Sequence, residues 1–514
     1  MPRKIQLNNR LRSIESAAAE ETNLLLAIRN QLAAEKLTDW LWGQKESIEA
    51  VVRHQLGLRR DEACAVLPVD SWIRGGFNIC ILVQVNSSCG LGRRLVFRCP
   101  MPHKLAEDDN PGTVDEKVGC EVAAYVWMQE FCPDVRIPKL YAFGLCDGQQ
   151  FTHVSKRPYF IRAYHTFRKW IHRFLRWYPL LSDYHRDVSA PAISTAYMLL
   201  EYIGPETGQM LSCTWPLHRH DPDRRARLYS GMSRIMLSLA RLPQPRIGSF
   251  RFNPADGTIS LSNRPVTCTM MLFENSGMPR TMQPGQLYQS TDSFVSDMLS
   301  LYDAHFLHDP HAVRDVDDAQ ERMTIRTLLR AVTHYFISKD RRDGPFLLQL
   351  TDFHQSNIFV DDEWNVTCLM DLEWICALPA DMLSVPYWLT GCSIDTIIDD
   401  YGTFDEARKE FLAVMDEEAR HVKADHGLDI TSIMRSVWES KGVWFWACLR
   451  SINGWLFVFE DHILPRFGAE KELVVDLKRL STLWHESVGA VVERKVKEEE
   501  GYQAELRAVF EDDA

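Results

Sequence analysis

Three polar side chains near residue 360 have the types and the spacing needed to handle a phosphoryl group. Asp352 and Asn357 form an Asp-x-x-x-x-Asn pattern, and Asp371 follows the apolar run VTCLM. Phosphoryl transfer needs oxygen ligands for magnesium and a carboxylate beside the attacking hydroxyl. The runs IFV and VTCLM, joined by the turn DDEWN, predict a β-hairpin. Such a hairpin places Asn357 and Asp371 at the same end of its ladder, with Asp352 on the preceding loop.

A hairpin bounded by acidic residues is more often an ordinary surface hairpin. Asp361 and Asp362 are explained as its solvated turn. Asp371 favours the functional interpretation, because it directly follows an apolar run, where a carboxylate is normally avoided. We therefore interpret this segment as a candidate phosphoryl-transfer site.

The elements that would position this site lie in the first part of the chain. The runs ICILVQV and RRLVFR, separated by a Ser/Cys/Gly turn, predict another hairpin. A helix is predicted from Thr113, and strands are predicted at 137–144 and 196–204. Apolar residues recur at helical spacing across 11–59, which predicts a helical N-terminal segment.

The segment 151–190 interrupts this scheme and is predicted to be an insertion. Aromatic and basic residues interleave between 162 and 178. Three interpretations are open: a helical hairpin packed on the body, a basic face for RNA or lipid, or a lid over substrate. Phe174, Trp177 and Leu181 fall at helical spacing, which favours packing.

Helices are predicted to dominate after residue 205. A β-like patch is expected at 248–268 and a helix at 320–337. The remainder, 380–514, is expected to be helical and to end in an acidic tail. No internal repeat is visible in the sequence.

Composition and charge narrow the functional classes. The 514 residues carry a formal net charge of −12, which disfavours general attraction to nucleic acid or anionic membranes, although a local basic patch can overrule it. The thirteen cysteines lack C-x-x-C spacing, as expected of reduced buried thiols. The N-terminus lacks a signal-peptide pattern, and the aromatic run 443–459 is too short to span a bilayer. We expect a cytoplasmic protein of unknown oligomeric state.

The segment LTDFHQSNIFVDDEWNVTCLMDLEW resembles the catalytic segment of the aminoglycoside phosphotransferases and their relatives, written H-G-D-x-H-x-x-N followed by I-D-x-[DE]. It is most similar to the large fungal branch of that family. The resemblance runs from about Leu41 to about Phe467 and implies an α+β, bilobal protein-kinase-like fold. The implied parts are an N-terminal helical extension (1–62), a small β-rich N-lobe with one main helix (63–204), a larger, mostly helical C-lobe (205–475), and a C-terminal helix with an acidic tail (476–514).

The resemblance implies a role for each matching position near the predicted hairpin. Asp352 matches the catalytic aspartate, which accepts a proton from the substrate hydroxyl or orients it. Asn357 and Asp371 match the magnesium ligands. Glu373 matches the second acid after the metal aspartate, which holds a second ion or faces substrate.

The resemblance also implies a nucleotide site. Arg98 stands where kinases have the lysine that binds the phosphates, so it is both a catalytic and a cofactor-binding candidate, with Glu121 as its helix partner. Arginine binds phosphate bidentately and is not equivalent to lysine. The other implied positions are the phosphate-covering turn (Gly75, Gly76, Asn78) and the interlobe hinge that reads adenine (Glu201, Ile203).

Two further positions depart from the family pattern, because Leu350 and Thr351 replace its leading His and Gly. The implied function is an O-phosphotransferase that uses ATP and Mg²⁺ to phosphorylate a hydroxyl of a small molecule in a fungal secondary pathway. Two alternatives stay open. One is a kinase fold diverted to nucleotidyl transfer or to tRNA-dependent peptide or cyclodipeptide formation, and the other is a non-catalytic scaffold.

Overall fold

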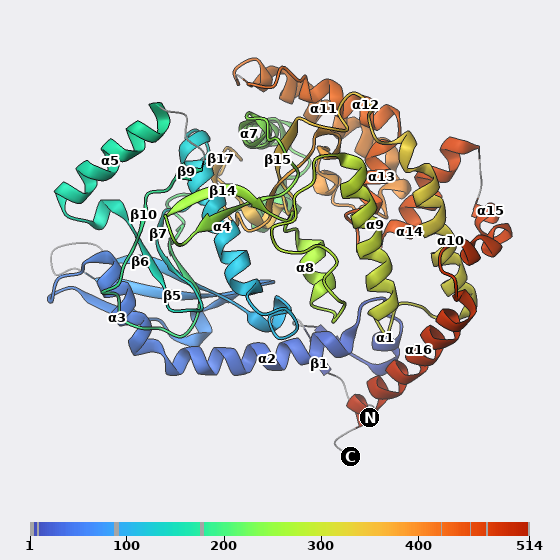
Figure 1. The fold of residues 1–514 in the computed structure, drawn as a ribbon, viewed down its shortest axis with the longest axis horizontal. Helices are drawn as coiled ribbons and strands as arrows, with labels where there is room; N and C mark the ends of the chain where they lie inside the picture. Colours follow the sequence, from blue (N-terminus) through green and yellow to red (C-terminus); the bar gives the residue numbers. More distant parts are fainter. Residues whose placement is uncertain are drawn as a thin grey trace.

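The computed structural model of the protein describes residues 5–7, 10–86, 92–174, 179–422, 424–452, 454–468 and 471–511. It is a mixed α and β structure, with most strands before residue 202 and most helices after it (Figure 1). Within these residues no helix combines the length and the apolar character needed to cross a bilayer. The cysteines in the described part of the chain are free thiols, as their scattered spacing predicted.

An eight-stranded antiparallel sheet forms the first part of the molecule, with the predicted hairpin within it. β5 and β6 pair from Asn78 opposite Pro100 to Val85 opposite Arg93. The turn predicted between them, at 87–91, lies outside the described residues. In spatial order the strands are β10 (Tyr184–Arg186), β8 (Gln150–His153), β7 (Leu140–Gly144), β11 (Tyr197–Glu201), β6 (Arg93–Pro100), β5 (Asn78–Asn86) and β3 (Ala63–Val66), and β4 (Ile73–Arg74) pairs with β5.

Helices cover both faces of this sheet. Because successive strand residues point to opposite faces, Met198 and Leu200 of β11 pack with α4 (Thr113–Phe131), while Leu199 packs with α3 (Lys45–Leu56) on the other face. The double-sided burial explains why the strand sequences are apolar almost throughout.

The N-terminal segment is docked, and it is not one helix. The helical stretch predicted at 11–59 contains three helices, and α2 ends where Gln44 leaves the helical geometry. The elements are β1 (Ile5–Leu7) paired with β2 (Arg10–Arg12), then α1 (Ile14–Ala18), α2 (Leu24–Gly43) and α3.

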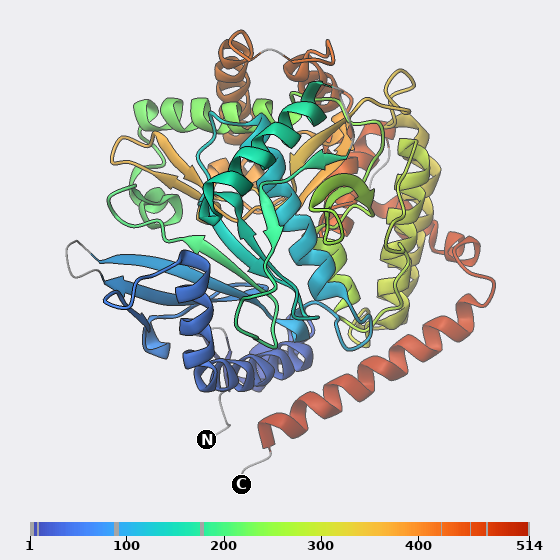
Figure 2. The same cartoon turned by 60° about the vertical axis from the view of Figure 1, so that its left-hand side comes forward.

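The segment predicted as an insertion at 151–190 belongs partly to the sheet. Residues 151–153 lie in β8 and 184–186 in β10, so only the part between them departs from it. That part carries α5 (Tyr159–Phe174), which lies on the outside of the molecule (Figures 1 and 2). The packing interpretation is wrong for Phe174, which is 73% exposed, and right for Leu181, which is buried. Trp177 lies outside the described residues.

The second part of the chain is mainly helical, as predicted, with short ladders. The β-like patch is a hairpin of β13 (Ser249–Asn253) and β14 (Thr258–Asn263), joined by β9 (Leu180–Leu181). The helix expected at 320–337 begins earlier and ends at Val332. The helices are α6 (Leu211–His218), α7 (Pro222–Ala240), α8 (Cys268–Glu274), α9 (Thr291–His308), α10 (Val316–Val332), α11 (Tyr401–Ala419), α12 (Ile430–Glu439), α13 (Gly442–Cys448), α14 (Trp455–Val458), α15 (Lys471–Asp476) and α16 (Val488–Glu511).

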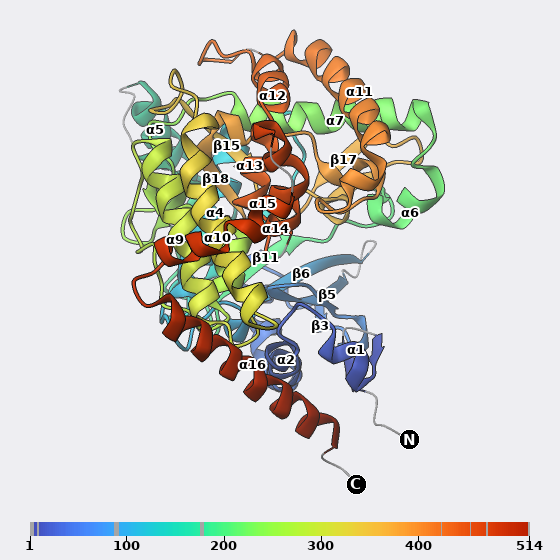
Figure 3. The same cartoon turned by 90° about the vertical axis from the view of Figure 1, so that its right-hand side faces the viewer.

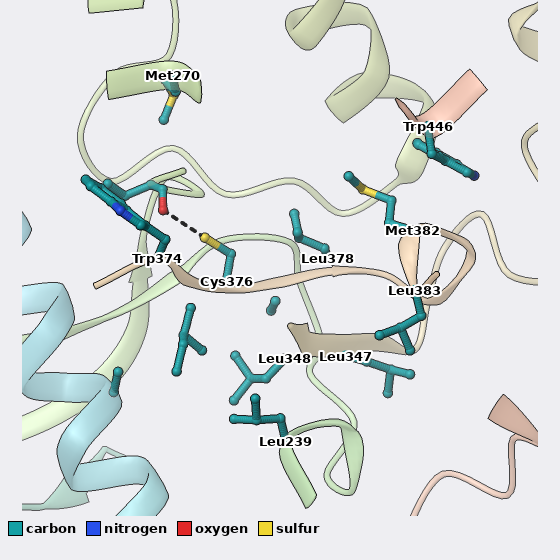
Figure 4. Packing of buried hydrophobic residues seen from close by; sticks show 14 of the residues in the cluster. Leu239, Met270, Leu347, Leu348, Trp374, Cys376, Leu378, Met382, Leu383 and Trp446 are labelled. Atoms are coloured by element: carbon teal, nitrogen blue, oxygen red, sulfur yellow. Dashed lines mark hydrogen bonds between the residues drawn. The ribbon is translucent and has the colours of Figure 1, made fainter. Parts of the chain in front are cut away.

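The main apolar core does not break at the boundary expected near residue 204. It runs from α4 and β7 through Leu347 and Leu378 to Trp446 in α13. Figure 4 shows part of it, where Leu347, Leu348 and Leu378 pack below Met382 and the thiol of Cys376 donates a hydrogen bond, 3.0 Å, to the carbonyl of Val266.

The C-terminal helix packs against the N-terminal segment (Figure 3). Tyr502 and Leu506 of α16 share a small core with Leu24 and Leu25 of α2, and the Tyr502 hydroxyl accepts a hydrogen bond from the Leu24 amide, 2.9 Å. His311 lies between the two segments. Its Nδ1 is 2.7 Å from Glu499 Oε2 and its Nε2 is 2.7 Å from the Glu20 carbonyl oxygen. We call this contact the terminal clasp.

Candidate active site

Two short antiparallel ladders bring the candidate residues together. β16 (Ile358–Val360) pairs with β17 (Val366–Leu369), and β15 (Phe346–Leu350) pairs with β18 (Ile375–Pro379). β12 (Gln209–Met210) adds a third strand to the first ladder. The loops that leave both ladders, 351–357 and 370–374, lie side by side, since the Thr351 amide donates to the Trp374 carbonyl at 3.0 Å.

The predicted hairpin places Asn357 and Asp371 at one end of its ladder. The Met370 amide donates to the Asn357 carbonyl at 2.8 Å, so Asp371 is one residue beyond this contact. The Asn357 side chain is buried and its Nδ2 donates to the Asp352 carbonyl at 3.0 Å. This bond fixes the loop that carries Asp352 and leaves Asn357 Oδ1 available as an acceptor.

Asp352 is a partly exposed carboxyl in an acidic environment. Burial raises the pKa of Asp352, His354 lowers it, and Asp371 and Glu373 raise it further. His354 Nε2 is 3.6 Å from Asp352 Oδ1, too far for a hydrogen bond. The hydrogen bond from the Thr351 amide to the Trp374 carbonyl keeps the Asp352 loop next to the segment that carries Asp371 and Glu373.

Asp371 has an unusual backbone conformation. Its φ is +57°, in the left-handed region that non-glycine residues rarely adopt. The conformation turns the chain at the end of β17, and Asp371 Oδ1 accepts a hydrogen bond of 2.6 Å from Arg98 Nη2. Strain of this kind persists only where the surroundings hold it, which is common at functional sites.

Arg98 is the centre of a buried ion cluster. From β6 its guanidinium reaches Glu121 Oε1 at 2.5 Å on α4, as well as Asp371 and, at 3.2 Å, Glu373 Oε2. Burial opposes the charge of Arg98, but Asp371, Glu121 and Glu373 raise its pKa well above the ordinary value. The arginine thus joins the sheet, the helix and the hairpin loop.

Lys117 is a second cation in the cluster, and sequence reasoning missed it. Its Nζ lies 2.5 Å from Glu373 Oε2 and 3.2 Å from Glu121 Oε2, and it donates to Asn78 Oδ1 at 2.7 Å. The Lys117 side chain is 1% exposed. Its i,i+4 spacing from Glu121 was the available signal, but the same spacing occurs in surface ion pairs and does not indicate burial. Two cations therefore face three carboxylates, leaving one net negative charge (+2 − 3) in the cluster.

The predicted phosphate-covering turn connects directly to this cluster. Gly75 donates from its amide to the Asn78 carbonyl at 2.9 Å, which closes a tight turn between β4 and β5. Asn78 Nδ2 donates to Glu373 Oε2 at 2.9 Å. Phe77 packs edge-on against Trp374 with ring centroids 5.0 Å apart. Gly75 and Gly76 are exposed at the tip, so backbone groups there are open to solvent.

The predicted hinge residues lie at and just after the end of β11. The Glu201 carboxylate accepts from the Lys139 amide at 3.0 Å and from Arg136 Nη2 at 3.2 Å, so its side chain holds the start of β7. Ile203 is buried. The structure therefore brings Asp352, Asn357 and Asp371 together with the Arg98 cluster, whereas the Glu201 side chain bonds Arg136 and the Lys139 amide.

A cavity of about 510 Å³ opens beside the Asp352 loop. Thr351 and Phe353, the neighbours of Asp352, line it together with Tyr387, Asp395 and Arg450. Arg450 Nη2 donates to Ser384 Oγ at 3.2 Å, and no carboxylate of the described residues forms an ion pair with it. Burial lowers the pKa of Arg450. Sequence reasoning missed this arginine, because only the folded chain brings the segment after α13 to the loop.

Comparisons with known proteins give no family assignment. No protein-family model matches the sequence, and no curated protein matches it. Among solved structures, a ternary complex of a thermostable mutant of the aminoglycoside phosphotransferase APH(4)-Ia with AMP-PNP and hygromycin B matches at 13% identity and a TM-score of 0.35, covering 87% of this chain and 98% of that one. The apo form of a thermostable mutant matches at 11% identity and a TM-score of 0.33, covering 91% and 99%. Likenesses at this level carry no argument about this chain.

Proposed function

We propose that the chain is an O-phosphotransferase that moves the γ-phosphoryl group of ATP to a hydroxyl of a small molecule. One observation carries the proposal. Asp371, held in a left-handed conformation, shares the end of a ladder with Asn357, and Asp352 lies on the adjoining loop beside a cavity large enough for a metabolite.

The donor set fits a magnesium ion that is held jointly by protein and nucleotide. Asn357 Oδ1 and the Asp371 carboxylate are hard oxygen donors. No three His, Cys, Asp or Glu side chains in the described residues converge as a ready-made metal site. This agrees with the usual magnesium arrangement of one or two carboxylates completed by phosphates and water. When bound, the ion would neutralise charge on the phosphates.

Glu373 fits the ion cluster better than the metal role implied by the family resemblance. Its Oε2 accepts from Asn78 and lies within ion-pair distance of Lys117 and Arg98. Oε2, with three such partners, has little capacity left for a metal, so a metal ion would have to bind Glu373 through Oε1. We propose that Glu373 balances the two cations and that Arg98 orients the Asp371 carboxylate.

Asp352 is the proposed catalytic residue. Its pKa is raised mainly by burial, and its neighbours Thr351 and Phe353 line the cavity. We propose that its carboxylate accepts a hydrogen bond from an acceptor hydroxyl at the edge of the cavity and aligns it. The exposed turn at Gly75 and Gly76 is proposed to cover the phosphates with backbone amides. We propose in addition that residues 63–204 bind the nucleotide and that 205–475 bind the acceptor.

The cavity presents two charged side chains, Arg450 and Asp395, to the proposed acceptor molecule. Arg450 suits a carboxylate or phosphate group, whereas Asp395 suits an amine or a hydroxyl. The proposed acceptor is therefore a hydroxylated compound that carries an anionic group.

The test is Mg²⁺-dependent binding of ATP measured by calorimetry, together with transfer of labelled phosphate to a panel of hydroxylated acids, amino acids and sugars. Asp352→Asn should keep ATP binding and lose turnover by about a hundredfold or more. Asp371→Asn should lose the magnesium dependence of binding. Asp362→Asn, which removes an exposed carboxylate from the turn of the same hairpin, is the matched control. A wild-type protein that binds no nucleotide in the presence of Mg²⁺ refutes the proposal.

One observation favours a non-catalytic scaffold as the second candidate. The Asp371 carboxylate would be expected to be free if it bound a metal ion. Instead, Arg98 already forms an ion pair with it at 2.6 Å. If the protein is a scaffold, neither the wild type nor the Arg98→Lys variant should bind ATP. If it is an active phosphotransferase in which the nucleotide releases Asp371 from Arg98, the wild type should show Mg²⁺-dependent binding of ATP.

A further inference from the structure

Helix α5 presents its apolar face to solvent. Tyr159, Phe160, Tyr164, Phe167, Trp170 and Phe174 are between 56% and 81% exposed. At 3.6 residues per turn these six positions fall on one side of the helix. A soluble helix normally buries such a face, but no element among the described residues covers this one.

The aromatic rings form a continuous ridge. Phe167 stacks with Trp170 at a centroid distance of 6.3 Å, and Trp170 stacks with Phe174 at 5.6 Å. Trp, Tyr and Phe are the side chains that favour the boundary between lipid and water, because an apolar ring can enter the acyl region.

The opposite side of α5 fastens the helix to the body. His165 Nε2 lies 2.8 Å from Asp183 Oδ1, and Lys169 Nζ lies 2.8 Å from Asp183 Oδ2 and 3.2 Å from Glu130 Oε2. His165 is buried. These contacts fix the orientation of α5, so the ridge faces outward because of the fold and not through fraying.

The charge of this segment is opposite to that of the whole protein. Residues 156–176 contain seven Lys and Arg and no Asp or Glu, although the chain carries −12 overall. On the helix, Arg168 lies beside one edge of the ridge and Arg162 beside the other. Long basic side chains at such edges can reach lipid phosphates while the rings are inserted.

We propose that α5 is a peripheral membrane anchor that lies in the surface of anionic bilayers, with its aromatic ridge in the headgroup region. Charge complementarity favours this occupant: a basic, acid-free helix in an acidic protein fits an anionic surface. Nucleic acid fits less well, because the ridge side has no basic side chain between its rings, whereas strand binding needs cations and rings on one face. The inference is independent of the phosphotransferase proposal.

The experiment is co-sedimentation of the full chain with vesicles of phosphatidylcholine alone or with 30% phosphatidylserine (roughly the anionic content of a cytoplasmic leaflet). Binding is expected only to the anionic vesicles and should weaken as salt rises. The triple variant Phe167→Ser, Trp170→Ser, Phe174→Ser should lose about tenfold or more in affinity. Arg162→Gln with Arg168→Gln should weaken binding to anionic vesicles.

The matched control is Leu217→Ser with Leu483→Ser, which removes two other exposed leucines and should leave binding unchanged. Circular dichroism and thermal unfolding establish that each variant is folded. Absence of wild-type binding to anionic vesicles at low salt overturns the proposal, as does equal binding by the triple variant. A ridge-dependent dimer in size-exclusion chromatography, or ridge-dependent binding of single-stranded RNA without vesicle binding, assigns the face to another partner and also overturns it.

Discussion

Replacing Lys117 with Met tests whether the buried ion cluster is an electrostatic unit. The side chain is 1% exposed and lies within 3.2 Å of oxygens from Glu373, Glu121 and Asn78. Methionine preserves most of the volume and removes one of two cations that face three carboxylates. Removing one partner of a buried ion pair typically costs about 3–5 kcal/mol, because it leaves a charge without compensation. We expect Lys117→Met to lower the free energy of unfolding by this amount at pH 7.

The assay is urea unfolding followed by circular dichroism at pH 7. Lys117→Met combined with Glu373→Gln removes one charge of each sign and should recover about half of the loss or more. Lys169→Met removes a partly exposed lysine from a different pair and serves as the control. A cost below about 1 kcal/mol, or a double variant that recovers none of the loss, refutes the reasoning.

Three further predictions concern other titratable or charged groups. Burial, with Glu321 nearby, raises the pKa of Glu460 to about 7, so the charge of Glu460 destabilises the fold increasingly from about pH 4.5 to pH 7. Glu460→Gln should therefore raise the melting temperature at pH 8 and leave it unchanged at pH 4, and equal shifts at both pH values contradict this. Burial lowers the pKa of His311, but its bonds to Glu499 and to the Glu20 carbonyl raise the pKa overall, so the terminal clasp should be strongest below about pH 6.5. Hydrogen exchange in α16, corrected for intrinsic rates, should increase from pH 6 to pH 8, and His311→Gln should abolish that increase. Arg450→Met should raise KM for an anionic acceptor by about tenfold or more without changing ATP affinity, whereas an unchanged KM excludes Arg450 from the acceptor site.

Local patterns in the sequence predicted the elements well. The paired strands β5 and β6, the helix α4 and the β16–β17 hairpin each have their signal within a short stretch, so residue spacing was sufficient to find them. The contact of Arg98 with Glu121 was expected from the family resemblance, and the structure places these groups 2.5 Å apart.

Features that depend on distant contacts could not be predicted in this way. The helical spacing of Phe174, Trp177 and Leu181 favoured packing, but α5 ends at Phe174, and spacing does not say whether another element covers a face. Lys117 has the sequence pattern of a surface lysine, and only the arrival of Asp371 and Glu373 from far along the chain makes its burial favourable. Arg450 likewise becomes a cavity residue only when its loop meets the segment around Ser384.

The terminal clasp affects the order in which the molecule can be completed during synthesis. The hydrogen bond between the Leu24 amide and the Tyr502 hydroxyl joins residues 478 positions apart. While the chain is still being made, Leu24 and Leu25 have no partner on α16, and their apolar side chains stay available to other molecules. Contacts of such long range form late and slowly, and exposed apolar segments invite aggregation. We therefore expect the apolar face of α2 to need protection by chaperones until α16 has been synthesised.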